Sequence, residues 1–162
     1  MMYFTYCDSP LDGILLVSDG DCLTGLYLLP EQTRLRPGKD WVRDNVGLLV
    51  EVERQIKAYF AGELRKFTIP VRLQGTAFQQ RVWQLLPEIG FGETVSYGEL
   101  AKQLGQPQAV RAVGSANGRN PVCIIVPCHR VVGAKGQLTG YSGGVKRKQW
   151  LLTHEQKIAA SS

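Results

Sequence analysis

The pattern of the chain changes at residue 75, and this change limits the folds that it can adopt. Before this point, short apolar runs are separated by turn sequences such as SPLDG and DGDC. After it, polar capping residues and closing glycines delimit short helices. A chain of 162 residues provides one compact domain or two small ones. We therefore predict an α/β protein with two domains, 1–75 and 76–162, the second of them mostly helical.

The first part of the chain predicts an antiparallel sheet. Its three apolar runs, at 3–7, 13–18 and 23–29, have the length of strands and are joined by tight turns. Strands joined in this way form a meander, in which each strand pairs with the next. Residues 31–45 are polar and contain a Pro-Gly pair, so we expect a loop there.

A helix with a buried face follows this loop. Apolar residues recur at spacings of three and four between Leu48 and Phe60, and Gly62 stands where a C-terminal cap belongs. Residues 63–75 then have the pattern of a short extended segment. These first 75 residues contain no cluster of chemically active groups, so we interpret this part as a scaffold.

Two capping boxes begin the helices of the second part. Thr76 with Gln79 begins a helix that ends near Gly90, and Ser96 with Glu99 begins a shorter one that stops at the next glycine. In each box, a side-chain oxygen accepts a hydrogen bond from the first turn of the helix. This reciprocal pairing predicts where both helices start.

A third helix completes the outline of a helix-turn-helix. Pro107 suits its first turn, and the apolar spacing runs through Val110 and Val113 to about Gly118. Two short helices joined by a tight turn at Gly105 are typical of this motif. An ordinary helical hairpin has the same local pattern, so both interpretations stay open.

Positive charge is concentrated in the second half. Residues 1–80 contain nine Lys and Arg against ten Asp and Glu, whereas residues 81–162 contain ten against four. Between Glu99 and Glu155 there is no acidic residue. The basic residues of this acid-free stretch are Lys102, Arg111, Arg119, Arg130, Lys135, Lys146, Arg147 and Lys148. Such a distribution favours a polyanionic partner, because each phosphate neutralised by Lys or Arg releases counterions.

Small side chains surround Arg111 in the third helix. They are Ala109, Ala112, Gly114, Ser115 and Ala116. Small residues do not reach across a major groove, but they allow a helix to approach something narrow with one long cation projecting from it. A DNA minor groove and a closely packed second helix both fit this pattern.

A candidate reactive thiol follows a short apolar run. Residues 122–126 are wholly apolar and predict a buried strand. The run leads into Pro127, Cys128, His129 and Arg130, where a neighbouring imidazole and guanidinium can lower the pKa of the thiol. Cys123 lies inside the apolar run, and Cys7 and Cys22 have no histidine near them in sequence. Cys128 is therefore the candidate nucleophile.

Three other interpretations of this cluster stay open on spacing alone. A metal site needs more ligands than the two histidines, His129 and His154, provide, and the chain has no CxxC pair. A papain-like hydrolase pairs a thiolate with a distant imidazole, which His154 could supply. A purely structural Cys-His dipeptide is the third.

The segment Ile125–Val132, with the sequence IVPCHRVV, resembles the active-site signature of the O6-alkylguanine-DNA alkyltransferases, also called methylated-DNA–protein-cysteine methyltransferases. Further blocks resemble this family and follow its order across the second half. They are Ser96–Gly98 at the start of the helix-turn-helix, Arg111–Gly114 and Asn120–Pro121 in the recognition helix and hinge, Thr139–Gly144 in the substrate pocket and Trp150–Glu155 in the last helix. The first half fits more loosely, through SPLDG and the YFAG segment.

The resemblance implies a single-turnover reaction. Cys128 would attack the alkyl carbon on O6 of a damaged guanine, while His129 accepts the thiol proton through a water molecule and Glu155 orients the imidazole. Asn120 would support the turn that carries the nucleophile, and Tyr97 would donate a hydrogen bond to the base. Because water does not cleave the resulting thioether, the protein would react once. The residues implied to line the substrate pocket are Tyr141, Ser142, Gly143 and Val131.

The resemblance also implies that the helix-turn-helix enters the minor groove and that Arg111 fills the place of a flipped base. The further residues implied to touch DNA are Ala109, Ala112, Ser96, Ser115 and Arg119. The candidate phosphate contacts are Lys102, Arg119, Lys146, Arg147 and Lys148. Val110 stands where the family usually has alanine, so it either adds a bulkier groove contact or turns into the core.

No metal or cofactor is expected. Some relatives hold zinc in the first half through two cysteines and two histidines, but no histidine precedes His129 here. The implied partner is double-stranded DNA containing O6-alkylguanine, or O4-alkylthymine as a second substrate, bound by a monomer. The chain has neither a membrane-length apolar run nor the pattern of a secretory signal, so we expect a cytoplasmic protein with reduced thiols. A DNA-binding regulator without a reactive thiol and a cysteine hydrolase with turnover are the competing functions.

Overall fold

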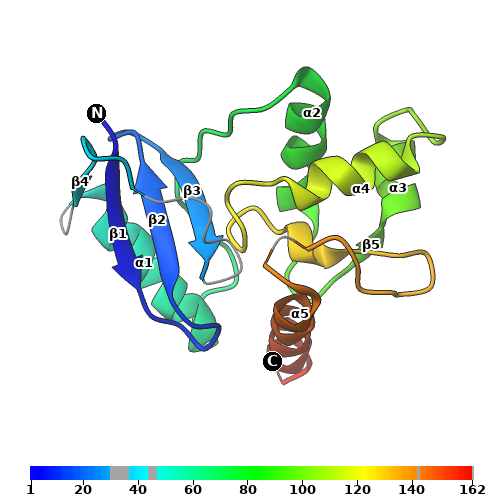
Figure 1. Cartoon of the computed structure of the whole chain (residues 1–162). Helices are drawn as coiled ribbons and strands as arrows, with labels where there is room; N and C mark the ends of the chain where they lie inside the picture. The colour runs from blue at the N-terminus through cyan, green and yellow to red at the C-terminus, as the bar shows by residue number, and fades with distance from the viewer. Residues whose placement is uncertain (30–36, 44–46, 142, 162) are drawn as a thin grey trace. The chain divides into compact units, whose positions relative to one another are not determined.

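The computed structural model of the chain describes residues 1–29, 37–43, 47–141 and 143–161 (Figure 1). They form two compact units, one of Met1–Leu73 with Pro121–Ile125 and one of Gln74–Asn120 with Val126–Ser162. A division at residue 75 alone places Pro121–Ile125 in the second domain, whereas these residues pack with the first. Each unit has its own core.

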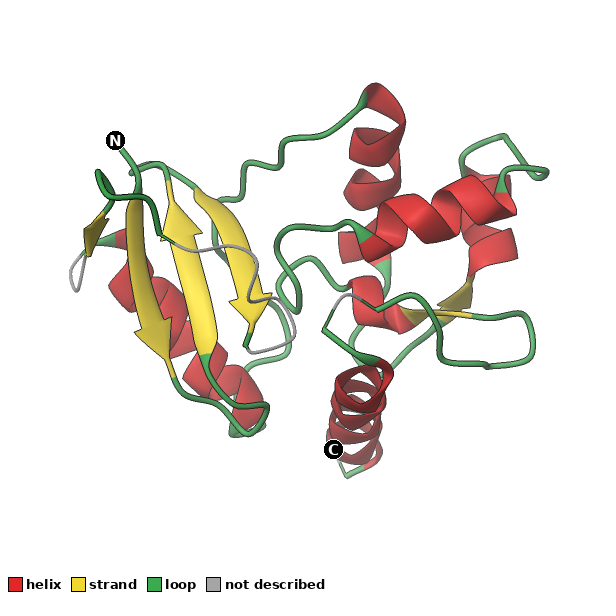
Figure 2. Ribbon diagram, in the orientation of Figure 1, coloured by secondary structure: helices red, strands yellow, loops and turns green. Residues whose placement is uncertain are grey.

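The first unit contains the predicted meander. Strands β1 (Tyr3–Cys7), β2 (Ile14–Ser18) and β3 (Leu23–Leu28) pair antiparallel in sequence order (Figure 2). Every residue of the central strand β2 is buried, because the strand has a neighbour on either side and helix α1 (Leu48–Phe60) packs against the sheet. The α/β character expected for this part is confirmed.

A fourth strand was not predicted. Strand β4 (Val42–Arg43) pairs parallel with β1 at the edge of the sheet, and the Val42 amide donates to the carbonyl of Met2 at 2.9 Å. The sheet is therefore mixed, with the order β3-β2-β1-β4. The prediction of a loop over 31–45 is wrong for these two residues, since a pairing of two residues leaves no periodic signal. Residues 31–36 and 44–46 lie outside the described residues.

Helix α1 agrees with its predicted bounds. It buries an apolar stripe that includes Leu49, Val52 and Ile56. The chain leaves the helix at Gly62 with a φ of 79°, a left-handed conformation that glycine adopts without a steric penalty. The segment after it is extended, as predicted, and Val71 forms a parallel bridge with Leu23 beside β3.

The predicted strand at 122–126 is absent from the structure. Only Val122 forms a bridge, with Leu26 of β3, and the chain then turns. Ile124 has a φ of 72°, outside the strand region, and the Ile125 amide donates to the carbonyl of Cys123 at 2.8 Å. The apolar run indicated burial correctly, since Val122, Cys123 and Ile124 are at most 1% exposed. A short buried run does not reveal its own backbone conformation.

The second unit begins with the two capped helices. Helix α2 (Ala77–Leu85) has the complete capping box of Thr76 with Gln79, and α3 (Tyr97–Gln103) has that of Ser96 with Glu99. Both predicted starts are confirmed. Helix α2 stops five residues before Gly90 and continues as the 3-10 turn η1 (Leu86–Glu88). The reason is Pro87, which has no amide hydrogen to continue the α-helical ladder.

Helix α4 (Val110–Gly118) packs against α3 after a tight turn at Gly105, which has a φ of 73°. This is the predicted two-helix outline. Pro107 was expected in the first turn of α4, but it lies in the turn before the helix. There the Ala109 amide donates to the carbonyl of Gln106 at 2.9 Å, and the helix starts one residue later.

The remaining elements of the second unit surround the candidate nucleophile. The 3-10 turn η2 (Cys128–Arg130) leads into β6 (Val131–Val132), which pairs parallel with β5 (Val95–Ser96). Helix α5 (Val145–Ala160) packs against η2 (Figure 2). In the described part of the chain, no helix has the length and apolarity that a membrane crossing requires.

We expect Thr76→Ala to lower the free energy of unfolding by about 1 kcal/mol, because it removes the oxygen that accepts a hydrogen bond from the Gln79 amide. Thr153→Ala is the matched control, since Thr153 is exposed in the interior of α5. Urea unfolding of both variants measures the difference. Equal losses in the two variants would contradict the role of the cap.

Candidate active site

The turn that carries Cys128 is held by two asparagine side chains. Asn120 Nδ2 donates to the carbonyl of Val126 at 2.8 Å, and Asn117 Nδ2 donates to the carbonyl of Cys128 at 3.1 Å. Both asparagines are buried, and Cys128 itself is 1% exposed. The thiol therefore sits on a backbone that is fixed on both sides of Pro127.

Asn117 was not among the predicted site residues. It lies on the inner face of α4, one turn after Val113, and both are fully buried. A polar residue on the apolar stripe of a helix was the available signal, because burying an amide is unfavourable unless it forms hydrogen bonds. The structure thus ties the nucleophile to α4 through a residue that the motifs did not single out.

His129 and Glu155 form a fully buried pair. Nε2 of His129 lies 2.6 Å from Oε2 of Glu155, and neither side chain has any exposed surface. Burial lowers the pKa of His129 below its ordinary value and outweighs the opposing effect of Glu155. The imidazole is therefore neutral at pH 7, with its Nε2 hydrogen donated to the carboxylate. Among the described residues, Nδ1 of His129 has no hydrogen-bond partner, which leaves its lone pair able to accept a proton.

Arg130 is bound to Glu155 rather than directed at the thiol. Its Nε and Nη2 lie 2.8 and 3.1 Å from the two carboxylate oxygens, and its Nη1 donates to the carbonyl of Ile89 at 2.7 Å. Burial raises the pKa of Glu155, but the hydrogen bonds and charges of His129 and Arg130 outweigh burial and place the pKa below its ordinary value. Glu155 is therefore a carboxylate at pH 7.

Two of the predicted phosphate contacts are buried. Arg147 is 8% exposed and Lys148 has no exposed surface, because both lie on the inner face of α5. Their assignment to phosphate contacts is wrong. Lys148 Nζ instead donates to the carbonyl of Thr139 at 2.8 Å and to the Tyr97 hydroxyl oxygen at 3.2 Å. Sequence position does not reveal which face of a helix a lysine occupies when its neighbours are also basic.

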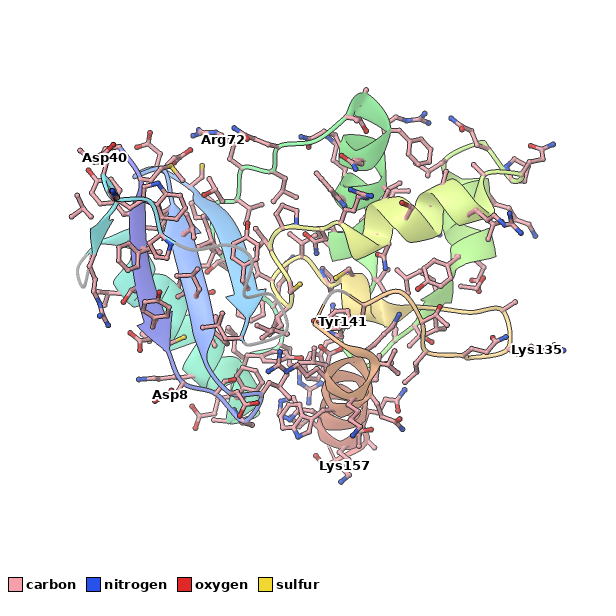
Figure 3. The ribbon with its side chains drawn as sticks, viewed as in Figure 1. Asp8, Asp40, Arg72, Lys135, Tyr141 and Lys157 are labelled. Carbon is pink, nitrogen blue, oxygen red and sulfur yellow. The ribbon has the colours of Figure 1, made fainter. Side chains whose placement is uncertain are left out.

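The candidate phosphate contacts that are exposed are Lys102, Arg119 and Lys146. Lys135 lies exposed at the tip of the loop that follows β6 (Figure 3). These four residues come from the acid-free stretch and keep their positive charge at the surface.

The loop before α5 is anchored by Tyr97, the first residue of α3. The Tyr97 hydroxyl donates to the carbonyl of Thr139 at 2.9 Å. The loop also approaches α4 so closely that a Cβ atom on Gly118 would lie 2.9 Å from the Gly140 carbonyl oxygen. Tyr141 is 7% exposed in this loop, which Figure 3 shows beside the start of α5.

The predicted pocket residues are placed as follows. Gly143 is buried in the same loop as Tyr141, Val131 is fully buried in β6, and Ser142 lies outside the described residues. Tyr97 itself is 9% exposed. Tyr97 and Tyr141 are therefore both mostly buried, and they come from α3 and from the loop before α5.

One face of α4 is open to solvent. It carries the predicted DNA contacts Arg111, Ala112, Ser115 and Arg119. Since Ala112 and Ser115 are exposed, their small size is not explained by packing against the described residues. Ala109, at the N-cap, and Ser96, whose hydroxyl caps α3, are half-buried.

Val110 also belongs to the open side of α4. It is 39% exposed, which excludes the alternative that it turns into the core. The opposite side of the helix is fixed, because Trp83 of α2 donates its indole hydrogen to the carbonyl of Ala116 at 2.8 Å. The helix therefore presents a stable surface.

Of the other three thiols, Cys22 is partly exposed, whereas Cys7 and Cys123 are buried. Cys123 is fully buried in the first unit. Burial, followed by the charge of Glu53, raises the pKa of Cys7 to about 12. Within the ranges that the structure describes, no cluster of three or more His, Cys, Asp or Glu side chains could hold a metal ion.

These contacts define the chemistry that the site can support. A neutral imidazole next to a thiol, oriented by a buried carboxylate, can accept the thiol proton and leave a thiolate. A thiolate is a soft nucleophile suited to attack on carbon.

Both parts of the chain match one family. Residues 2–73 match the 6-O-methylguanine DNA methyltransferase, ribonuclease-like domain, and residues 77–157 match the 6-O-methylguanine DNA methyltransferase, DNA binding domain. The methylated-DNA–protein-cysteine methyltransferase of Mycobacterium leprae is 51% identical over 162 residues, which cover 100% of this chain and 97% of the relative. That of Methanosarcina acetivorans is 47% identical over 154 residues, which cover 95% of this chain and 98% of the relative.

Solved structures agree with these matches. The crystal structure of Mycobacterium tuberculosis O6-methylguanine methyltransferase has a TM-score of 0.89 and 48% identity, and the match covers 100% of this chain and 97% of that one. A crystal structure of Mycobacterium tuberculosis OGT in complex with DNA has a TM-score of 0.87 and 48% identity, over 96% of this chain and 94% of that one. The predicted α/β architecture, a sheet with a helix followed by a mostly helical part, is confirmed by this similarity.

We expect Glu155→Gln to lower the free energy of unfolding by about 3 kcal/mol at pH 7, because it leaves the Arg130 guanidinium buried without a counter-charge. The folded-state pKa of Glu155 is below its ordinary value of 4.5. The carboxylate therefore contributes fully above that pH, and its contribution is lost as the pH falls further. The difference between the variant and the parent protein should shrink in acid.

Urea unfolding at a series of pH values measures this change. Glu93→Gln is the control, because Glu93 is exposed and its loss should have little effect at any pH. A difference for Glu155→Gln that stays constant as the pH falls would contradict the ionised state assigned to the carboxylate.

Proposed function

Because the chain belongs to the methylated-DNA–protein-cysteine methyltransferase family, we propose that it repairs DNA by transferring an alkyl group from the O6 atom of guanine to its own Cys128. The family resemblance of the sequence motifs is confirmed by the same comparisons. The observation that carries the assignment of the acceptor is the buried His129–Glu155 pair, whose histidine directly follows Cys128 in the turn η2.

In the proposed reaction, the Cys128 proton passes through a water molecule to Nδ1 of His129. The sulfur then forms a bond to the alkyl carbon as the bond between this carbon and guanine O6 breaks. The electron pair of the broken bond remains on the guanine, which takes up one proton, and His129 gives up the thiol proton to water, so that protons balance over the whole reaction. Water does not cleave the thioether, so each protein molecule reacts once. No cofactor takes part in the proposed reaction.

Asn120 and Asn117 support this step by holding the backbone on which the sulfur is carried. Tyr97 is proposed to exchange its hydrogen bond with Thr139 for one to the leaving base. Val131, Tyr141, Ser142 and Gly143 are proposed to line the pocket around that base. O4-alkylthymine is a second candidate substrate of the same pocket.

The base must leave the DNA stack to reach the thiol. We propose that α4 enters the minor groove with its open face, where Ala112 and Ser115 allow close approach and Arg111 occupies the space of the extruded base. Ala109, Ser96 and Arg119 border the same surface, and Lys102 and Lys146 are candidate phosphate contacts. The protein is proposed to act as a monomer in the cytoplasm, where a reducing environment preserves the thiol.

The direct test is the mass of the protein after reaction. Equimolar protein and duplex containing O6-methylguanine should give one added methyl on the peptide that contains Cys128, with no further turnover. Cys128→Ala should lose the transfer but retain DNA binding, and Cys123→Ala is the matched control that should retain both. Bound but unmodified protein would favour a DNA-binding regulator, and repeated turnover would favour a hydrolase.

We expect Arg111→Ala to slow transfer from duplex DNA about tenfold or more, because stabilising an extruded base is worth a few kcal/mol. Transfer from the free base O6-methylguanine needs no extrusion and should be little affected. Single-turnover kinetics on both substrates measure the two rates. Equal losses on the duplex and on the free base would overturn the role of Arg111 in base extrusion.

A further inference from the structure

We propose that Arg130 is a positioning residue, which neutralises the charge of Glu155 and so keeps His129 uncharged and ready to accept the Cys128 proton. This inference rests on the proposed transfer reaction, because it assigns the origin of the thiolate. Arg130 forms its hydrogen bonds with the Glu155 carboxylate and the Ile89 carbonyl. It acts through Glu155.

Hydrogen bonds to two partners fix the orientation of the Arg130 side chain. Its fork binds both oxygens of Glu155, at 2.8 Å from Nε and 3.1 Å from Nη2, and its third nitrogen donates to the Ile89 carbonyl at 2.7 Å. The guanidinium also lies 5.8 Å from the centre of the Phe91 ring. A planar fork with these partners holds the carboxylate so that Oε2 faces the imidazole.

Charge balance explains why the cation is needed. The three groups that bind one another in the resting site are one positive guanidinium, one negative carboxylate and a neutral imidazole, so the charges within this cluster cancel. When the thiol proton reaches His129, an imidazolium and a thiolate form together and the net charge does not change. Neither state requires an uncompensated charge in surroundings where such a charge is unfavourable.

Without Arg130, the buried carboxylate would be left as a lone anion. The His129–Glu155 pair would then bind a proton at higher pH than in the parent protein, because a shared proton removes that lone charge. An imidazolium, which has a proton on Nδ1 as well as on Nε2, has no lone pair that can accept the thiol proton. The thiol would remain protonated and unreactive at neutral pH.

The other charged group that acts on His129 is Lys148 of α5. Its positive charge, like that of Arg130, lowers the pKa of the imidazole, whereas Glu155 raises it. Lys148 forms its hydrogen bonds with Thr139 and Tyr97. The charge of Lys148 is therefore the same in all the variants described below. Its hydrogen bonds do not take the place of those between Arg130 and the Glu155 carboxylate.

The test is a titration of His129 by NMR, which needs no DNA and no transfer. In Arg130→Met, His129 should take up a proton roughly one pH unit or more above the parent protein. In Arg130→Lys, which keeps the charge, the shift should be smaller. The His129 resonances of the parent protein, recorded over the same pH range, are the reference for every variant.

A double variant separates charge from structure. Arg130→Met combined with Glu155→Gln removes both charges, so His129 should again be neutral at the pH where it is neutral in the parent protein. If Arg130→Met does not fold, the comparison of this double variant with Arg130→Lys and Glu155→Gln provides the same test. An unchanged His129 titration in Arg130→Met, or equal shifts in the Met and Lys variants, would overturn the proposal.

The rate of methyl transfer gives a second readout. Arg130→Met should transfer about tenfold more slowly at neutral pH and recover as the pH is raised, because the pair then loses its extra proton. A loss of the same size at every pH would mean that Arg130 only supports the fold. Absence of methylation in the parent protein would instead refute the proposed function, while the histidine titration would still report on Arg130.

Discussion

The buried carboxylate of Glu155 is the constraint around which the second unit is organised. It reaches from α5 to His129 and Arg130 in η2, and Arg130 in turn binds the carbonyl of Ile89 after η1. A buried carboxylate without such partners would be strongly unfavourable, so these three segments must stay together for the charge to be tolerated. The same contacts leave the imidazole neutral with one nitrogen free of partners in the described structure. Stability and chemical readiness therefore depend on one set of hydrogen bonds.

The helix that presents the open face also holds the turn that carries Cys128. Asn117 of α4 binds the carbonyl of Cys128, and Asn120, just beyond the helix, binds that of Val126. Arg111 projects from the same helix. A rigid connection of this kind places the proposed base-extruding residue and the sulfur in one unit, so that docking of the helix also positions the thiol. Tyr97 and Lys148 attach the pocket loop to the neighbouring helices in a similar way.

Local chemistry explains what was predictable from the sequence. The capping boxes at Thr76 and Ser96 predicted their helices because each pairing lies within four residues. The family resemblance, rather than local chemistry, pointed to the pairing of His129 with Glu155 and to Asn120 as a support of the turn, and the structure contains both contacts. The conformation at Ile124 and the burial of Lys148 were not predictable, because a short apolar run does not reveal its backbone conformation and a basic helix does not reveal which lysine faces inward. Asn117 had a signal, its polar side chain on the apolar stripe of α4, but the sequence did not reveal its partner at Cys128. Arg130 was expected beside the thiol, but its partner Glu155 lies 25 residues away.

The fate of the transferred carbon distinguishes alkyl transfer to Cys128 from every other outcome. A duplex with a ¹³C-labelled methyl on guanine O6 can be mixed with one equivalent of protein and followed by NMR. The account predicts that the label moves to a thioether methyl resonance that persists and is missing in Cys128→Ser. Label released as methanol would contradict the account, as would label that remains on the DNA bound to folded protein.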